Sequence, residues 1–311
     1  MQILIAEDDP VSRRLLEATL SGWGHDVIVT RNGKEAMSIL RGANPPKLAI
    51  LDWMMPGLDG VEVCRRLRKS QKEDYVYIIV LTSRNNADDI LECMVAGADD
   101  YITKPFKTGE LKARIFAANR IVDLHEKFIQ AQNQLKQQAT HDFLTGLWNR
   151  SGILNILHKE LSRAQRDNTS VTVMIGDLDN FKAVNDSFGH KAGDIVLKEV
   201  ARRMTTALRP YDGYGRYGGE EFLVVVPCCD ITFAEEVAQR IRRAICKGPV
   251  IYDEHEITIT MSLGATAVLG ASPEDSDLII RAADAALYVA KESGRNRVQV
   301  VDAPALTGSS A

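Results

Sequence analysis

Short apolar runs alternate with longer segments of helical periodicity through residues 1–118. Five runs have the length and the β-branched composition of buried strands. They are Ile3–Ala6, Val27–Thr30, Leu48–Leu51, Ile78–Leu81 and Tyr101–Thr103. Repeated strand–helix units of this kind predict a doubly wound parallel sheet, and therefore an α/β domain over residues 1–118.

A different pattern follows in residues 119–140, where apolar residues recur at heptad spacing. The a and d positions are occupied by Ile121, Leu124, Phe128, Ala131, Leu135 and Gln138. Such a repeat predicts a helical coiled-coil seam, a weak one because alanine and glutamine take two d positions. The segment has no Gly or Pro and joins two domain-sized regions, which favours a parallel dimeric stalk. A single amphipathic helix packed on its own domain is the alternative.

A second α/β domain is expected over residues 141–302. Its strands are predicted at Val171–Gly176, Phe222–Val226, Ile257–Ala267 and Val298–Val301. Residues 303–311 are mostly small and polar, which predicts a disordered tail.

The amino-acid composition agrees with two domains and indicates the cellular compartment in which we expect the protein. A chain of 311 residues with 45% hydrophobic content can fill two cores. A net charge of -4 lacks the basic field of a DNA-binding protein, so we expect no DNA partner. Five scattered cysteines suit a reducing compartment. With neither a signal peptide nor a long apolar run in the sequence, we expect a cytoplasmic protein without membrane contact.

Polar side chains gather at the predicted carboxyl ends of four strands in residues 1–118. The acids are Glu7, Asp8 and Asp52, and they are joined by Thr82 and Lys104. Ligand sites in doubly wound sheets lie at these strand ends, so one site is expected to collect them. The acids suit Mg²⁺, and Asp52, which directly follows a buried strand, is the candidate nucleophile for a phosphoryl group. Taken singly, each is an ordinary solvated residue.

Together and in this order, these residues resemble the receiver domains of two-component response regulators, which have a flavodoxin-like fold. The resemblance implies an Mg²⁺ site at Glu7, Asp8 and Asp52, with Asp52 as phosphoacceptor. It also implies a switch formed by Thr82, Tyr101 and Lys104, and a cognate histidine kinase as phosphodonor. Asp9 fits a solvated helix N-terminus about as well as it fits the acid site.

Two glycines and two acids, Gly218, Gly219, Glu220 and Glu221, stand immediately before an apolar strand. Glycine lets a backbone approach a ligand closely, and adjacent acids at a strand edge can hold a divalent cation or take a proton. Asp177 ends another buried strand, and its carboxylate beside Glu220 would suit metal-dependent nucleotidyl transfer. An acidic hairpin turn is the alternative, and a helix cap would explain the nearby Asp179.

The GGEEF run at residues 218–222 resembles the signature of the GGDEF family of diguanylate cyclases. The resemblance extends over residues 141–301 and includes the run DFLTGLWNR at 142–150. It implies a nucleotidyl-cyclase-like α/β fold and the joining of two GTP into cyclic di-GMP with release of two pyrophosphates. Asp177, Glu220 and Glu221 would hold Mg²⁺, for which Mn²⁺ can substitute. Glu220 would act as general base or as metal ligand only.

The resemblance also assigns the substrate contacts. Asn185 and Asp194 would read guanine, since a carboxylate accepts from its N1–H and N2–H₂ edge. The glycine pair would admit the nucleotide, and basic side chains would hold the triphosphate. Those basic residues are Lys182, Lys291 and Arg295.

An RxxD pattern, Arg209 to Asp212, lies five residues before Gly218. Alone it would be a surface ion pair, but the offset matches the inhibitory cyclic di-GMP site of the family, with Arg240 as a second contact from a neighbouring domain. A two-fold symmetric product further implies a homodimer. The alternative from another class is a non-catalytic response regulator that binds GTP or cyclic di-GMP and signals through partner contacts.

Overall fold

A five-stranded parallel sheet forms the centre of the first unit, with strand order β2-β1-β3-β4-β5. Its strands are β1 (Gln2–Ala6), β2 (Asp26–Thr30), β3 (Leu48–Asp52), β4 (Tyr77–Thr82) and β5 (Asp100–Thr103). All five predicted strands are present to within one residue at each end. The predicted doubly wound parallel sheet is therefore confirmed.

The structure is a computed structural model that describes residues 1–70, 75–84 and 86–302. The chain divides into two compact units between Gln132 and Asn133. Within the described ranges, no helix is both long and apolar enough to cross a membrane. The tail predicted at residues 303–311 lies outside the described residues.

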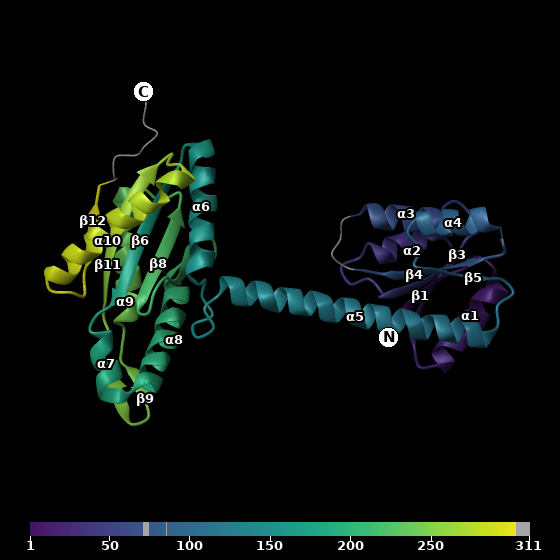
Figure 1. Ribbon diagram of the computed structural model, residues 1–311, viewed down its shortest axis with the longest axis horizontal. Coiled ribbons are helices and arrows are strands. Elements are labelled where there is room, and N and C mark those ends of the chain that lie inside the picture. The colour runs from purple at the N-terminus through teal and green to yellow at the C-terminus, as the bar shows by residue number, and fades with distance from the viewer. Residues whose placement is uncertain (71–74, 85, 303–311) are drawn as a thin grey trace. The chain divides into compact units, whose positions relative to one another are not determined.

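Helices cover both faces of the first sheet (Figure 1). They are α1 (Pro10–Gly22), α2 (Gly33–Leu40), α3 (Gly60–Lys69), α4 (Ala87–Val95) and α5 (Thr108–Thr140). Leu4 and Leu51 point to a core shared with α2, α3 and α4, whereas Ile3 and Ile50 point to a core shared with α1 and α5. Because side chains alternate along a strand, one apolar run supplies both cores.

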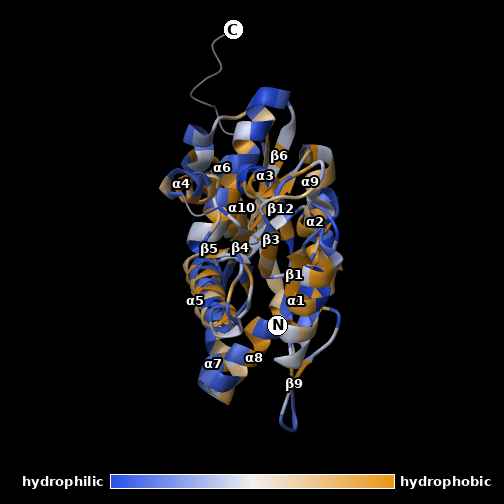
Figure 2. Ribbon diagram, turned by 90° about the vertical axis from the view of Figure 1, so that its right-hand side faces the viewer, coloured by the Kyte–Doolittle hydropathy of each residue, from blue (hydrophilic) through white to orange (hydrophobic). Residues whose placement is uncertain are grey.

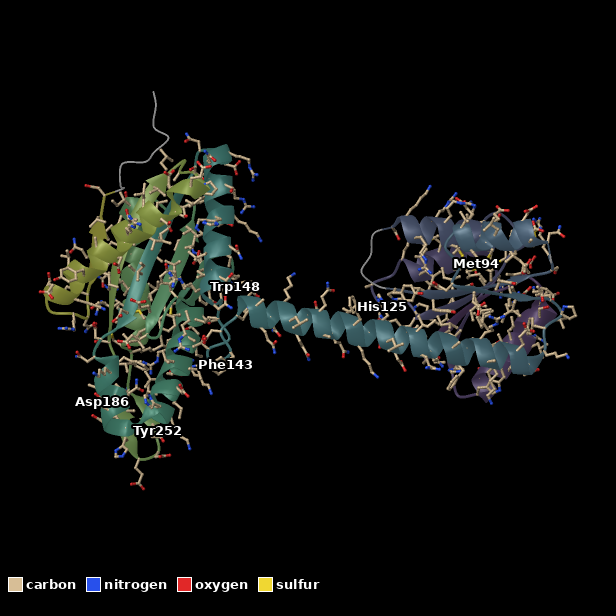
Figure 3. All side chains as sticks on the ribbon, in the orientation of Figure 1. Met94, His125, Phe143, Trp148, Asp186 and Tyr252 are labelled. Atoms are coloured by element: carbon tan, nitrogen blue, oxygen red, sulfur yellow. The ribbon has the colours of Figure 1, made fainter. Side chains whose placement is uncertain are left out.

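Helix α5 is continuous for 33 residues and begins well before the predicted stalk. Its first half packs on the sheet through buried residues that include Leu111, Ile115 and Val122. Further along lies His125, which is labelled in Figure 3. Its ring packs at a tilt against that of Tyr75, with 4.8 Å between centroids. These contacts anchor the part of α5 that belongs to the first unit.

The residues of the predicted coiled-coil seam are exposed in the single chain. The exposed fractions of the large apolar members are 43% for Ile121, 62% for Leu124, 64% for Phe128 and 65% for Leu135. Packing on the first unit therefore buries Leu111, Ile115, Ala118 and Val122 of α5 and leaves the seam positions exposed. In Figure 2, where α5 is seen nearly end-on, its visible turns carry both polar and apolar residues.

A second five-stranded sheet, in the order β12-β11-β6-β8-β7, forms the centre of the second unit. Its strands are β6 (Ser170–Leu178), β7 (Gly213–Arg216), β8 (Glu221–Pro227), β11 (Met261–Leu269) and β12 (Val298–Val301). Only the β11–β12 pair is parallel. The short edge strand β7 was not predicted, because Gly213 and Gly215 interrupt its pattern.

The single strand predicted at Ile257–Ala267 is wrong. The structure has two strands there: β10 (His255–Ile257), which pairs with β9 (Val250–Tyr252), and β11, which begins at Met261. Met261 lies opposite Leu178, the last residue of β6. An earlier start of β11 would therefore have no neighbouring strand to pair with.

Helices also cover the second sheet on both faces (Figure 1). They are α6 (Arg150–Asp167), α7 (Phe181–Phe188), α8 (His190–Ala207), α9 (Ile231–Ile245) and α10 (Ser276–Glu292), with a 3₁₀ turn at Pro273–Asp275. Leu223 and Val225 pack with α6 and α10, whereas Phe222 and Val224 pack with α8 and α9. Both faces of β8 are thus buried, and this packing holds in place the hairpin turn at the start of the strand.

Candidate functional site

Three acids meet at the carboxyl edge of the first sheet, where β1 and β3 end. Carboxylate oxygens of Glu7, Asp8 and Asp52 all lie within 4.8 Å of one another, and we call this group the N-terminal acid site. Glu7 and Asp52 are buried and Asp8 is exposed. Arg13 donates to the backbone oxygens of Glu7 and Asp8 at 2.9 and 3.0 Å, which holds this turn. Clustered hard oxygen donors of this kind suit Mg²⁺.

Lys104 reaches into the N-terminal acid site from the end of β5. Its Nζ lies 2.8 Å from Glu7 Oε2 and 3.0 Å from Asp52 Oδ1. Burial raises the pKa of Glu7, and the bond from Lys104 offsets part of that rise. Burial lowers the pKa of Lys104, but its bonds to Glu7 and Asp52 outweigh this, so the net shift is upward. The ammonium therefore acts as the counter-charge between two buried acids.

The other residues assigned to the switch lie on the neighbouring strands β4 and β5. Thr82 is the last residue of β4, is buried, and accepts a hydrogen bond from the Arg84 backbone at 3.0 Å. Tyr101 lies half-buried in β5, opposite Val80. Of the two roles considered for Asp9, the structure shows the one at a helix N-terminus. Its carboxylate caps α1 by accepting from Ser12 N at 2.7 Å.

A second group of acids, Asp177, Glu220 and Glu221, forms the C-terminal acid site. Asp177 in β6 lies directly opposite Glu221 in β8, so their side chains share one face of the sheet. Burial raises the pKa of Asp177, and the Lys291 ammonium, 2.9 Å away, offsets part of it. Burial also raises the pKa of Glu220, with a further rise from the charge of Asp177. The three carboxylates therefore sense one another electrostatically.

The two acid sites differ in compactness. Within the part of the chain that the structure describes, only the N-terminal acid site brings three ligand oxygens within 4.8 Å of one another. In the C-terminal acid site, Lys291 holds the Asp177 carboxylate instead.

The turn between β7 and β8 is tied to the start of the unit by Arg216. Its guanidinium donates to Gly219 O at 3.0 and 2.7 Å and pairs with Asp142 at 3.2 Å. Asp142 in turn accepts from the Thr145 backbone and hydroxyl at 2.9 and 2.7 Å. Sequence reasoning gave Arg216 no role, although it stands directly before the glycine-containing turn.

The predicted guanine-reading residues lie on consecutive helices. Asn185 belongs to α7 and Asp194 to α8, and the chain passes between them at Gly189, whose φ is +81°. A Cβ on Gly193 would fall 2.0 Å from Asn185 Oδ1, so this glycine makes room for the amide. Lys182, at the start of α7, and Arg295, just after α10, are exposed basic residues.

The residues assigned to an inhibitory site line one cavity of about 270 Å³. Arg209, Asp212 and Arg240 all border it, so Arg240 lies beside Arg209 within the same chain. Asp212 is 6% exposed and accepts from Arg209 N at 2.8 Å through one oxygen. Its other oxygen is buried and has no hydrogen-bond partner among the described residues. A buried acceptor of this kind suits a ligand that brings N–H donors.

Asp179 is not the helix cap that the sequence suggested. The N-cap of α7 is Asn180, and that cap makes no side-chain hydrogen bond. The Asp179 carboxylate instead accepts from Thr260 Oγ1 and Ser262 Oγ, each at 2.7 Å, and from Asn296 N at 3.0 Å. This role depends on contacts across more than 80 residues of sequence, which local patterns do not reveal.

Comparison with known families gives two matches that divide the chain. The family described as diguanylate cyclase, GGDEF domain, matches residues 139–297. The family described as response regulator receiver domain matches residues 3–116.

Curated proteins match the chain over nearly its whole length or over part of it. Response regulator PleD of Caulobacter vibrioides is 28% identical over 302 residues, which cover 96% of this chain and 65% of PleD. The chain therefore spans just under two thirds of that relative. Diguanylate cyclase DgcP of Pseudomonas aeruginosa is 36% identical over 62% of this chain and 28% of DgcP.

Two solved structures resemble the chain over about three fifths of its length. The coiled coil and GGDEF domain of DgcB from Caulobacter crescentus, in complex with c-di-GMP, has a TM-score of 0.55 at 29% identity and covers 61% of this chain and 99% of that one. Diguanylate cyclase SiaD from Pseudomonas aeruginosa, in complex with its activator SiaC, has a TM-score of 0.51 at 36% identity and covers 62% and 74%.

Proposed function

The chain belongs to the GGDEF family of diguanylate cyclases and also carries a response regulator receiver domain, and from this we propose that it condenses two GTP into cyclic di-GMP under control of phosphorylation. The division of labour would follow the predicted domains: a receiver at residues 1–118, a stalk at 119–140 and a cyclase at 141–302. A histidine kinase would be the phosphodonor for Asp52.

One observation carries the catalytic proposal. The GGEEF hairpin places Glu221 opposite Asp177 across β6 and β8, and the charge of Asp177 raises the pKa of Glu220 beyond the rise that burial causes. Three carboxylates that repel one another at a strand end suit a divalent cation, so the residues fit Mg²⁺. Mn²⁺ prefers the same oxygen ligands and would substitute.

In the proposed reaction, the 3′-oxygen of one GTP attacks the α-phosphorus of the other. The new 3′-O–P bond forms as the bond to pyrophosphate breaks, and the reciprocal step closes the ring. Bound Mg²⁺ would polarise the α-phosphate and neutralise the charge of the leaving pyrophosphate. Asp177, Glu220 and Glu221 would hold that metal, and Glu220 would also be placed to take the proton of the attacking hydroxyl.

The remaining residues of the site would bind and orient the nucleotide. Asn185 and Asp194 would read the guanine edge, and Gly218 and Gly219 would let the hairpin backbone approach the nucleotide. Lys182, Lys291 and Arg295 would neutralise the triphosphate. Lys291 already contacts Asp177, so triphosphate binding would draw this ammonium from a carboxylate to phosphate oxygens.

Each chain carries one such site, so a two-fold symmetric product requires two chains that face each other. The exposed heptad positions of α5 supply an apolar surface that two parallel copies could share. Phosphorylation of Asp52 would add an anion beside Lys104 and Thr82 and so shift the population of productively aligned dimers.

Chromatographic analysis of products tests the catalytic proposal. Incubation with GTP and Mg²⁺ should yield cyclic di-GMP and pyrophosphate, and Glu220→Ala should reduce the rate by at least about 100-fold. The control is Glu254→Ala, an exposed acid in the turn between β9 and β10. Retained nucleotide binding without any product would favour a non-catalytic receptor.

Feedback inhibition is proposed at the cavity lined by Arg209, Asp212 and Arg240. Arginine can bond guanine O6 and N7, and the unpartnered oxygen of Asp212 can accept from the opposite edge. Arg209→Ala should raise the cyclic di-GMP concentration that halves activity by about tenfold or more, since it removes a bidentate contact. Arg243→Ala, on helix α9 with Arg240 but outside that cavity, is the control. An unchanged inhibition curve for Arg209→Ala would remove the assignment.

A further inference from the structure

Asp179 joins three segments that are far apart in the sequence. It directly follows β6, and its side chain accepts from two hydroxyls in residues 260–262 and from a backbone N–H in the loop after α10. Its own N–H donates to Thr260 O at 3.0 Å. One oxygen is engaged by Ser262, and the other by both Thr260 and Asn296. The carboxylate is therefore committed to protein contacts.

The loop that Asp179 holds has an unusual backbone. Gly294, Arg295 and Asn296 are consecutive residues with φ of +109°, +57° and +48°. For residues other than glycine this conformation is unfavourable, more so for arginine than for asparagine, so surrounding contacts must maintain it. Asp179 supplies one such contact, at the backbone N–H of Asn296.

The same loop is held from its other side by α9. Arg242 Nη1 donates to Asn296 Oδ1 at 2.9 Å, and Cys246 Sγ lies 3.2 Å from the same oxygen. Asn296 is therefore fixed at its backbone and at its side chain by different elements. Arg295, immediately before it, has no freedom to move its backbone without breaking these bonds.

The loop carries Arg295, one of the cations of the C-terminal acid site. Lys291, on the last turn of α10, places its ammonium 2.9 Å from Asp177 Oδ2. Arg295 stands four residues further along the chain, in the loop, and its charge acts on the same carboxyl. The helix therefore positions Lys291, and the loop positions Arg295.

We propose that Asp179 is a positioning residue for the triphosphate: it fixes the left-handed turn at Arg295 and Asn296 so that Arg295 faces the phosphates of GTP beside Lys291. The inference rests on the proposed function for the nature of the substrate. Asp177, two residues away, has a different role, because its carboxylate remains available to a metal. The carboxylate of Asp179 does not.

The test measures substrate affinity and turnover separately. Asp179→Asn keeps the size of the side chain but removes its charge, and it should raise KM for GTP about tenfold while kcat changes less than about threefold. The Kd of α,β-methylene-GTP, which cannot release pyrophosphate, should rise by a similar factor in calorimetric titration. Adding Asp179→Asn to Arg295→Ala should cause little further loss, because both changes remove the same contact.

Two further variants guard against a protein that does not fold. Thr260→Val and Ser262→Ala each remove one hydroxyl that orients the Asp179 carboxylate, and each should give a smaller rise in KM of the same kind. Asp230→Asn is the matched control, because Asp230 caps α9 with its carboxylate in the same unit and should leave KM unchanged.

Unchanged KM and unchanged analogue affinity in Asp179→Asn would overturn the inference. Effects of Asp179→Asn and Arg295→Ala that add fully would also overturn it. An increased Mg²⁺ requirement with normal analogue affinity would assign Asp179 to metal binding instead and would reject the positioning role. If the wild type makes no cyclic di-GMP but Asp179→Asn still weakens analogue binding, the proposed reaction fails and the positioning role stands.

Discussion

Lys104 and Lys291 both contact an aspartate at the end of a strand, but in different surroundings. Lys104 bridges two buried carboxylates, Glu7 and Asp52, in a site where three acids lie within 4.8 Å. Lys291 contacts Asp177 alone and is one third exposed. The N-terminal acid site is therefore closely assembled within one chain, whereas the C-terminal acid site has an open arrangement of acids around one cation.

The sheets explain this difference. Parallel strands bring the ends of β1 and β3 to the same edge, so short turns deliver all the acids to one point. In the second sheet, β6 is antiparallel to β8, and the acids come from the end of one strand and from the turn before the other. In the proposed reaction, such a site would receive the nucleotide and face a second chain.

Disrupting the stalk seam should give the largest difference between the two acid sites: the activity of the second unit should fall, and ligand binding at the first should not. Phe128→Asp places a charge at an exposed a position and should weaken a parallel dimer by about 2 kcal/mol or more. Cyclic di-GMP formation at micromolar protein should then fall by about tenfold, while binding of beryllofluoride at the N-terminal acid site persists. Asn133→Asp, an off-seam change on the same helix, is the control.

The measurements for this prediction are initial rates over a range of protein concentration and molar mass by light scattering. Loss of activity without loss of dimer, or normal activity in a monomer, would contradict the stalk proposal.

Removing each lysine should show that the two lysines contribute differently to the stability of their units. Lys104→Ala leaves Glu7, which is 1% exposed, without its cation and should lower the unfolding free energy of the first unit by about 1–3 kcal/mol. Lys291→Ala removes a partly exposed pair and should cost the second unit about 0.5 kcal/mol. Scanning calorimetry on both variants checks this, and equal losses of stability would show that the two environments do not differ.

Mg²⁺ without nucleotide should stabilise the first unit only. At ten times its Kd, a metal that binds only the folded first unit stabilises that unit by about 1.4 kcal/mol. The second unit should not respond, because its acids are less closely grouped. The first calorimetric transition should therefore move alone, and Asp52→Asn should reduce the shift. Movement of both transitions would mean that the C-terminal acid site also binds metal unaided.

Much of this fold follows from local sequence. The short apolar runs of the first unit predicted every strand of its sheet, because β1, β3 and β4 are apolar on both faces and all five runs are flanked by helical periodicity. The hairpin at Gly218–Phe222 was also predictable, since glycines precede a β-branched run. The acids that end β1 and β3 do lie together, as the parallel topology requires.

Other features depend on contacts that the sequence does not show. The break between Ile257 and Met261 occurs because β6 ends at Leu178, and β7 pairs with β8 despite two glycines. Asp179 resembles a helix cap locally but bonds to Thr260, Ser262 and Asn296. In each case the partner is more than a few residues away, so propensity gives no signal.

The central proposal, that one chain couples phosphorylation in its first unit to GTP condensation in its second, has a direct test. Initial rates of cyclic di-GMP formation are measured with and without beryllofluoride, for the wild type and for Asp52→Asn. The account predicts that beryllofluoride raises the wild-type rate and leaves Asp52→Asn at its basal rate. Equal stimulation of both proteins, or none in the wild type, would contradict it.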